Sequence, residues 1–156
     1  MTDRGEIAGA LFLSGYNCAQ SVLCAFADVT GFSDQEAIHI AAGLGGGVAR
    51  MREICGTISA MAIVMGCVYG SDDPADYAAK AALYAHIQAA AAQFREKAGS
   101  IICRDLLGSL NDGRPQPEER SEAYYHRRPC KRFVELAART LEVYLAEHPQ
   151  KAGEKG

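Results

Sequence analysis

The sequence predicts an all-α protein, a single-domain helical bundle packed around a central buried helix at about residues 51–69. Alanine-rich segments carry apolar residues at spacings of three and four, and β-branched runs are few and short. The 156 residues suffice for one domain with its own core, and neither a repeat nor a shift in composition divides them. We therefore expect one domain over residues 1–148 and a disordered tail over 149–156.

The helices are expected at residues 3–14, 17–29, 33–43, 51–69, 73–98, 100–107 and 129–147. Several starts carry local signals. Asn17 is a good N-cap, Ser33 and Glu36 form a capping box, and Pro74 fits the first turn of the fifth helix.

The fourth segment, residues 51–69, is apolar on all faces, which is typical of a helix at the centre of a bundle. Residues 73–98 keep a polar face and should pack outside. Residues 108–122, GSLNDGRPQPEERSE, combine glycines, prolines and charges and are expected to form one long loop.

Composition excludes several classes of partner. A formal net charge of −3 means that the chain lacks the excess of basic residues that is typical of nucleic-acid-binding proteins. No apolar run reaches the roughly 20 residues that would insert into a membrane. The N-terminus lacks the basic start and continuous apolar stretch of a signal peptide, which favours a cytoplasmic location. The alanine-rich helical surface is compatible with a homodimer.

Four of the six cysteines fall close to expected helix starts. Cys18 follows Asn17, Cys55 follows a glycine run, and the other two follow Ser100 and Pro129; these two are Cys103 and Cys130. A helix N-terminus lowers the pKa of a thiol and favours thiolate, the form that binds metals and attacks disulfides. We expect these four sulfurs to converge on one pocket, with basic residues around Cys130 at its rim.

The other two cysteines are expected to pack in the core. Cys24 lies in mid-helix, and Cys67 lies near the end of its helix, where the dipole disfavours thiolate. No two cysteines form a C-x-x-C pair, so the spacings of zinc fingers and ferredoxins are absent.

The stretch GLGGGVARMREICG, residues 43–56, is expected to bring backbone close to Cys55. It lacks the Lys-Ser/Thr of a P-loop and a preceding strand, which argues against a phosphate site. We interpret Gly45, Gly46, Gly47 and Gly56 as the wall of the cysteine site, able to donate N–H groups to a cofactor or to thiolates.

Charged residues near these motifs allow two interpretations. Arg50 and Arg52 are either solvated or offset negative charge on thiolates. His126, four residues before Cys130, is either a ligand or proton donor, or an exposed loop residue.

The motifs SGYNCAQSV, GLGGGVARMREICGTISA, GSIICRDLLG and RPCKRFVELA resemble the C_GCAxxG_C_C family of putative redox-active proteins over about residues 5–145. The four cysteines of that family match Cys18, Cys55, Cys103 and Cys130. In its G-C-A-x-x-G block this chain has Thr57 and Ala60 where alanine and glycine are expected. The resemblance implies redox or metal chemistry without fixing a reaction.

Three functions follow from the four cysteines. The first is an iron–sulfur cluster for electron transfer or sensing, with a redox partner protein. The second is a thiol–disulfide oxidoreductase or redox sensor in which the same cysteines are the redox-active thiols. The third is a structural zinc site in a binding module. The residues alone identify no enzymatic reaction or substrate.

Overall fold

The computed structural model describes residues 3–150, which are helical throughout except for connecting loops. The elements are α1 (Arg4–Leu13), α2 (Cys18–Cys24), α3 (Ala27–Thr30), α4 (Asp34–Ala41), η1 (Ala42–Leu44), α5 (Gly45–Val48), α6 (Gly56–Tyr69), α7 (Tyr77–Ala98), α8 (Cys103–Leu107), η2 (Gly108–Leu110), α9 (Glu122–Arg127) and α10 (Cys130–Glu147). Within these residues, the β pairing is a single antiparallel bridge between Ile54 and Ile102. The all-α prediction is confirmed.

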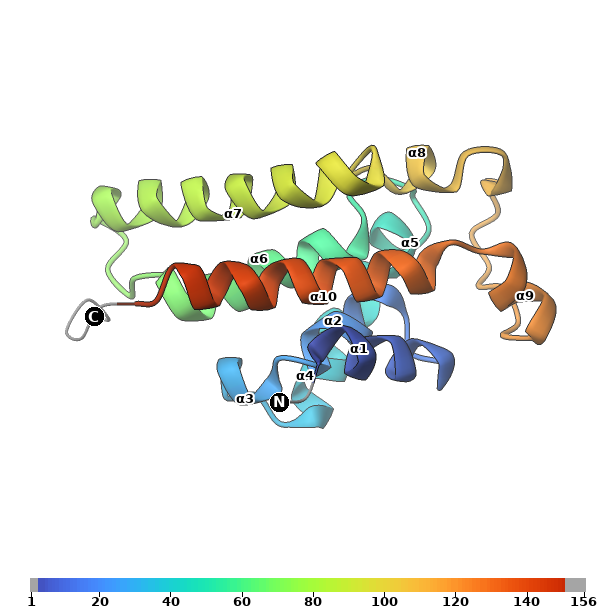
Figure 1. Ribbon diagram of the computed structural model, residues 1–156, viewed down its shortest axis with the longest axis horizontal. Coiled ribbons are helices and arrows are strands. Elements are labelled where there is room, and N and C mark those ends of the chain that lie inside the picture. Colours follow the sequence, from blue (N-terminus) through green and yellow to red (C-terminus); the bar gives the residue numbers. More distant parts are fainter. Residues whose placement is uncertain (1–2, 151–156) are drawn as a thin grey trace.

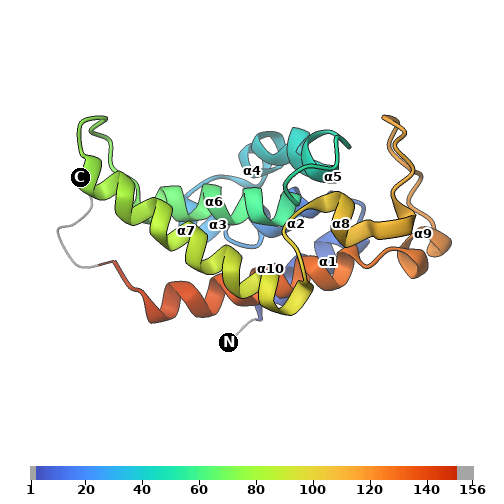
Figure 2. The same cartoon turned by 90° about the horizontal axis from the view of Figure 1, so that it is seen from above.

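Three long helices form the body of the molecule (Figure 1). α6 and α10 run in the same direction, and α7, which lies between them in the sequence, runs in the opposite direction. α6 and α10 therefore begin at the same end of the molecule. The short helices α1–α4 pack together on one side of this layer (Figure 1), and from above α1–α3 lie behind the long helices (Figure 2). The chain order thus brings several helix N-termini to the same end.

α6 is the central helix that the sequence predicted. It packs against α2, α3, α5, α7 and α10. Its buried side chains include Met61, Val64 and Met65, each at most 1% exposed. α7 has a polar outer face, as expected, and buries Ala90 and Phe94 against the body.

Several expected boundaries were wrong. The central helix begins at Gly56 rather than 51, because residues 46–50 and Arg52 have left-handed backbone that an α-helix cannot contain. The fifth helix begins at Tyr77, and Asp76, not Pro74, lies at its start.

The remaining corrections concern short elements. Residues 17–29 are two helices, broken between Cys24 and Ala27, and the helix expected to end at 43 ends at Ala41. The helix expected at 100–107 starts at Cys103, and Ser100 caps no helix; its hydroxyl accepts from the Ile102 N–H and donates to Asp105. The last helix starts at Cys130, with Pro129 as its N-cap.

The expected loop 108–122 also contains structure. It holds η2 and the first residue of α9, whose N-cap Ser121 accepts a hydrogen bond from the Tyr124 N–H at 3.2 Å. Residues 151–156 of the expected tail lie outside the described residues. No helix within residues 3–150 is long and apolar enough to cross a membrane.

Candidate functional site: a cavity lined by four cysteines

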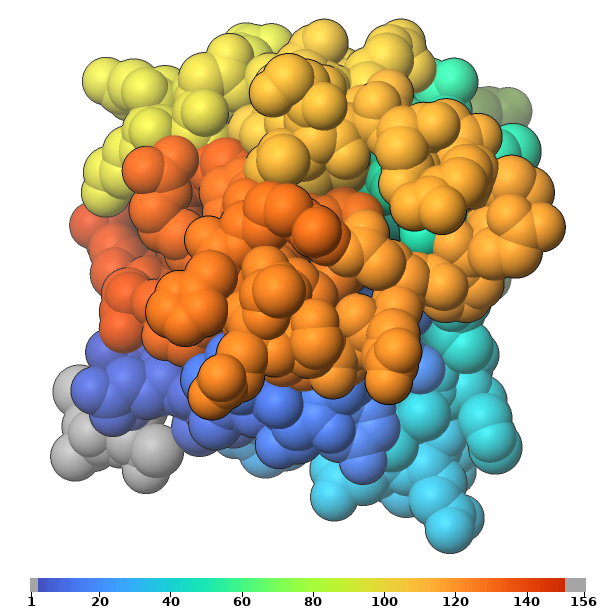
Figure 3. Space-filling model, turned by 90° about the vertical axis from the view of Figure 1, so that its right-hand side faces the viewer, coloured from blue at the N-terminus to red at the C-terminus, as the bar shows by residue number. Residues whose placement is uncertain are grey.

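Cys18, Cys55, Cys103 and Cys130 all line one cavity of about 310 Å³. The cavity lies at the end of the molecule where α6 and α10 begin, and further wall residues come from α5, α8 and α9. Figure 3 faces this end, where the loop after η2 and α9 cover the surface in orange. Cys24 and Cys67 are half-buried and do not line this cavity.

Each of the four cysteines stands at a helix start. Cys18, Cys103 and Cys130 are the first residues of α2, α8 and α10, and Cys55 is the N-cap of α6. The start of α2 is fixed by a capping box in which the Asn17 side chain accepts from the Gln20 N–H at 2.8 Å. The cavity therefore receives the positive ends of four helices.

A short backbone pairing holds Cys55 beside Cys103. The Cys55 N–H donates to the Ile101 carbonyl at 2.8 Å, and the Cys103 N–H donates to the Glu53 carbonyl at 2.6 Å. Both bonds flank the bridge between Ile54 and Ile102. This pairing places two cysteines 48 residues apart in sequence on adjacent segments.

The chain enters this pairing through a left-handed turn. Residues 46–50 all have positive φ, between 49° and 68°, and Arg52 follows at 62°. Left-handed backbone is easy for Gly46 and Gly47 but costs roughly 1–2 kcal/mol for each residue with a Cβ. Such strain persists only where the surrounding structure imposes it, and it collects at functional sites.

The glycines lie against the cysteine side chains. A Cβ on Gly56 would come within 2.6 Å of the Cys18 Sγ, and a Cβ on Gly47 would come within 2.7 Å of the Cys103 Cβ. A Cβ on Gly45 would lie 2.7 Å from the Asn17 side chain that caps α2. Gly45 and Gly46 themselves line the cavity.

Cys18 and Cys55 form a hydrogen-bonded pair of sulfurs. The bond from Cys55, together with backbone N–H groups of Gly46, Ala19 and Gly56, lowers the pKa of Cys18 to about 6. The pKa of Cys55 is raised well above 9.0, first by its bond to Cys18, then by burial and by the charge on Cys18. The two thiols titrate as a pair, in which Cys18 is the more acidic and Cys55 the less acidic.

The other two cysteines favour the thiol form. Burial raises the pKa of Cys130 to about 12, and the charge on Cys18 adds to this effect. Burial also raises the pKa of Cys103, against the influence of Arg52, whose Nη1 lies 3.6 Å from the Cys103 Sγ. Cys18 is thus the thiolate of the cavity.

Sequence reasoning missed one contributor and left the role of another open. The buried Thr57, noted only as a departure from the family pattern, places its hydroxyl 3.1 Å from the Cys55 Sγ. Of the two roles expected for Arg52, the solvated charge is wrong, because the side chain is only 6% exposed and contacts the Cys103 Sγ. Of the basic residues near Cys130, only Arg128 lines the cavity. No local sequence signal marks Arg52 for burial.

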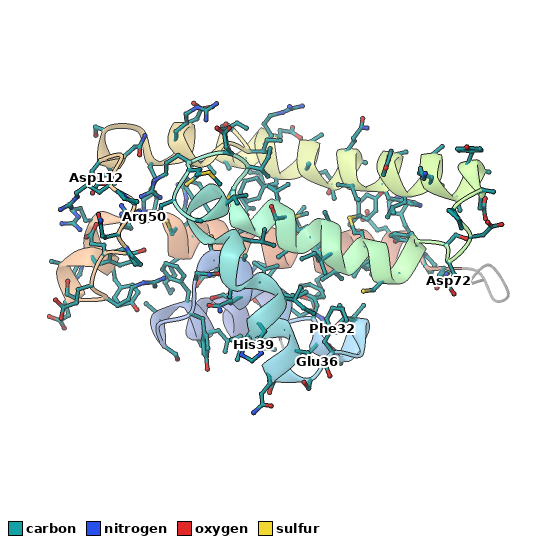
Figure 4. The ribbon with its side chains drawn as sticks, turned by 180° about the vertical axis from the view of Figure 1, so that it is seen from behind. Phe32, Glu36, His39, Arg50, Asp72 and Asp112 are labelled. Atoms are coloured by element: carbon teal, nitrogen blue, oxygen red, sulfur yellow. The ribbon has the colours of Figure 1, made fainter. Side chains whose placement is uncertain are left out.

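Arg50 binds the loop that covers the cavity. It pairs with Asp112 at 2.9 Å and donates to the Gln116 carbonyl (Figure 4). This contact joins the left-handed turn to the loop between η2 and α9. His126 is exposed on α9 and does not line the cavity.

The four thiols are chemically suited to zinc or to an iron–sulfur cluster, both of which accept four cysteines. Metal binding also requires that the ligand side chains be placed around one point. Among residues 3–150, no group of three or more His, Cys, Asp or Glu side chains is arranged to hold a metal ion.

Comparison with known proteins gives one family. No curated protein and no solved structure matches the chain significantly. A family model described as "Putative redox-active protein (C_GCAxxG_C_C)" matches residues 16–144, a span that contains all four cavity cysteines. The chain is therefore a member of this C_GCAxxG_C_C family.

Proposed function

We propose that this protein is a dithiol–disulfide redox protein in which Cys18 attacks and Cys55 resolves. The observation that carries this proposal is that Cys18 and Cys55 line one cavity, where the interaction of their side chains lowers the pKa of Cys18 and raises that of Cys55. A thiolate stabilised in this way is a nucleophile at neutral pH, and a second thiol in contact with it is suited to resolving a mixed disulfide.

The reaction consists of two consecutive thiol–disulfide exchanges. The Cys18 thiolate attacks one sulfur of a substrate disulfide, the substrate S–S bond breaks, and the other substrate sulfur leaves as a thiolate. Cys55 then loses its proton and attacks the Cys18 sulfur, so the second substrate thiol departs. The protein gives up two electrons and keeps a Cys18–Cys55 disulfide, which a dithiol redox partner in the cytosol would reduce again.

The coupling of the pair supports this order of events. The pKa of Cys55 is raised by its bond to Cys18 and by the negative charge there. When Cys18 enters a mixed disulfide, that charge disappears, and Cys55 becomes easier to deprotonate. The resolving thiol is thereby activated only after the first step.

The test uses single-cysteine variants and mass spectrometry of trapped species. Mild oxidation of the reduced protein should yield a Cys18–Cys55 disulfide, and Cys55→Ser should accumulate a mixed disulfide on Cys18 when given a small disulfide. Cys24→Ser is the matched control because Cys24 lies outside the cavity, and it should behave as wild type. Wild-type turnover by Cys18→Ser would refute the proposal.

An iron–sulfur cluster is the second candidate, favoured by four cysteines at four helix starts around one cavity. A cluster of several irons holds its cysteine sulfurs further apart than a single ion does, and it would supply one-electron transfer. Cys18, Cys55, Cys103 and Cys130 would be its ligands. Purification without oxygen, followed by iron, zinc and labile-sulfide analysis, distinguishes the cluster, a zinc site and the metal-free dithiol.

A further inference from the structure

The Arg52 guanidinium is buried in the cysteine cavity with two nitrogens unpartnered. The side chain lines the cavity, and its Nη1 contacts the Cys103 Sγ. Within residues 3–150, neither Nε nor Nη2 of Arg52 has a hydrogen-bond partner. A buried charge with free donors is unfavourable unless an anion pairs with it. The position of this side chain therefore points to an anionic ligand.

Other arginines at the cavity increase the positive potential. Arg128 is 8% exposed and pairs with Glu118 at 3.0 Å, and Glu118 is the only carboxylate among the lining residues in the described chain. Arg120 lies over the rings of Phe12 and Tyr124 and donates to backbone carbonyls. None of these contacts is with a carboxylate, so they do not neutralise its charge. Cations exceed anions around the cavity even when Cys18 is a thiolate.

Arg52 and the Cys18 thiolate lie near one another through Gly46. A Cβ on Gly46 would lie 3.6 Å from the Arg52 Nη1, and Gly46, Arg52 and Cys18 all line the cavity. One ligand could therefore reach both groups.

The remaining wall indicates that the ligand is more than a bare inorganic ion. Leu106, Leu107, Pro115 and Pro117 contribute apolar surface, and about 310 Å³ exceeds the volume of a sulfate or phosphate several times. A guanidinium fork matches a carboxylate in two parallel hydrogen bonds. These features together favour a small organic molecule that carries a carboxylate.

We infer that the cavity binds small carboxylate-bearing disulfides, with a carboxylate on Arg52 and the S–S bond at Cys18. This inference rests on the proposed dithiol function. The substrate is the oxidant: it takes two electrons from Cys18 and Cys55, its S–S bond breaks, and two carboxylate-bearing thiols leave. The carboxylate stays on Arg52 during the exchange, so it orients the disulfide without taking part in bond formation.

Binding is tested first, apart from the redox step. Cys18→Ser lacks the sulfur that attacks the disulfide, so calorimetry can compare the binding of dithiodiglycolate, neutral bis(2-hydroxyethyl) disulfide and cationic cystamine. We expect dithiodiglycolate to bind at least tenfold more tightly than either of the others. Adding Arg52→Gln should remove this preference, while Arg95→Gln, which removes an exposed charge on α7 outside the cavity, should keep it.

The redox arm uses the same three disulfides on the protein with all its cysteines. Oxidation of the Cys18–Cys55 pair should be fastest with dithiodiglycolate, and Arg52→Gln should slow that reaction at least tenfold more than it slows the reaction with the neutral disulfide. Arg52→Lys keeps the positive charge but lacks the two parallel N–H donors of the guanidinium, so it should give an intermediate rate. This variant replaces Arg52→Gln in the test if circular dichroism shows that Arg52→Gln is unfolded.

The outcomes separate the two proposals. If all three disulfides oxidise the pair at equal rates, the carboxylate site is refuted and the dithiol function stands. If dithiodiglycolate binds Cys18→Ser through Arg52 but Cys18 and Cys55 never form a disulfide, the dithiol function is refuted and the anion site stands. Binding of inorganic sulfate as tightly as dithiodiglycolate would overturn the assignment of an organic disulfide.

Discussion

The contact between Gly56 and Cys18 makes a quantitative prediction about stability. In Gly56→Ala the new Cβ would lie 2.6 Å from the Cys18 Sγ and 2.7 Å from the Leu44 carbonyl oxygen. Overpacking of this kind costs about 1–3 kcal/mol, and the helix preference of alanine returns at most about 1 kcal/mol. We expect a net loss of about 1–2 kcal/mol in the free energy of unfolding.

Gly66 provides a matched control in the same helix. A Cβ on Gly66 would meet nothing within 4 Å, so Gly66→Ala should gain about 0.5–1 kcal/mol. The two free energies are measured by urea unfolding of the reduced proteins. Iodoacetamide kinetics would show in addition whether displacement of Cys18 from the Gly56 N–H raises its pKa. Equal stabilities for the two variants, with Cys18 titrating as in wild type, would refute the described packing.

Three further predictions follow from the same geometry. Because the pKa of Cys18 is lowered, its alkylation rate should rise with pH through a midpoint near 6, and Cys55→Ala should move this midpoint upward; mass spectrometry of the alkylated protein checks both. The lowered pKa also means that ionised Cys18 stabilises the fold fully above the pKa of the unfolded thiol and loses that contribution as pH falls toward about 6, so the unfolding free energy relative to Cys18→Ser should fall across that window. Ala49→Gly should stabilise the protein by about 1 kcal/mol, because Ala49 has a φ of 49° and is exposed, and a thermal melt measures this gain.

The sequence predicts local features of this molecule well. The capping box at Asn17 depends only on neighbouring residues, and the all-round apolar face of α6 marks a central helix in any bundle. The position of Cys18 follows from such a signal, whereas the starts of α6, α8 and α10 have no side-chain cap. α9 carries a local signal too, since Ser121 caps it, but the charges and prolines before it favoured a loop.

Features that depend on distant contacts could not be predicted. Val48, Ala49, Arg50 and Arg52 have side chains that resist positive φ, so their left-handed backbone is imposed by the tertiary structure. The burial of Arg52 depends on where that backbone turns. The pairing of Cys55 with Ile101 joins segments whose proximity depends on the length of α7.

The left-handed turn explains how one short segment serves two thiols. Its first half brings the Gly46 N–H to Cys18, and its end places the Arg52 guanidinium on Cys103. A right-handed continuation of α4 would carry residues 46–52 along a helix axis instead of turning them back, and the Glu53 carbonyl would then be unable to accept from Cys103. The strain of the turn is offset by bonds such as the Arg52 N–H to Gly46 carbonyl at 3.1 Å and the Glu53 N–H to Gly47 carbonyl at 2.9 Å. Gly46 and Gly47 are thus required because they begin the left-handed turn, which Val48, Ala49 and Arg50 continue at a cost in strain. The completed turn fixes the position of the Arg52 guanidinium relative to the Cys18 sulfur.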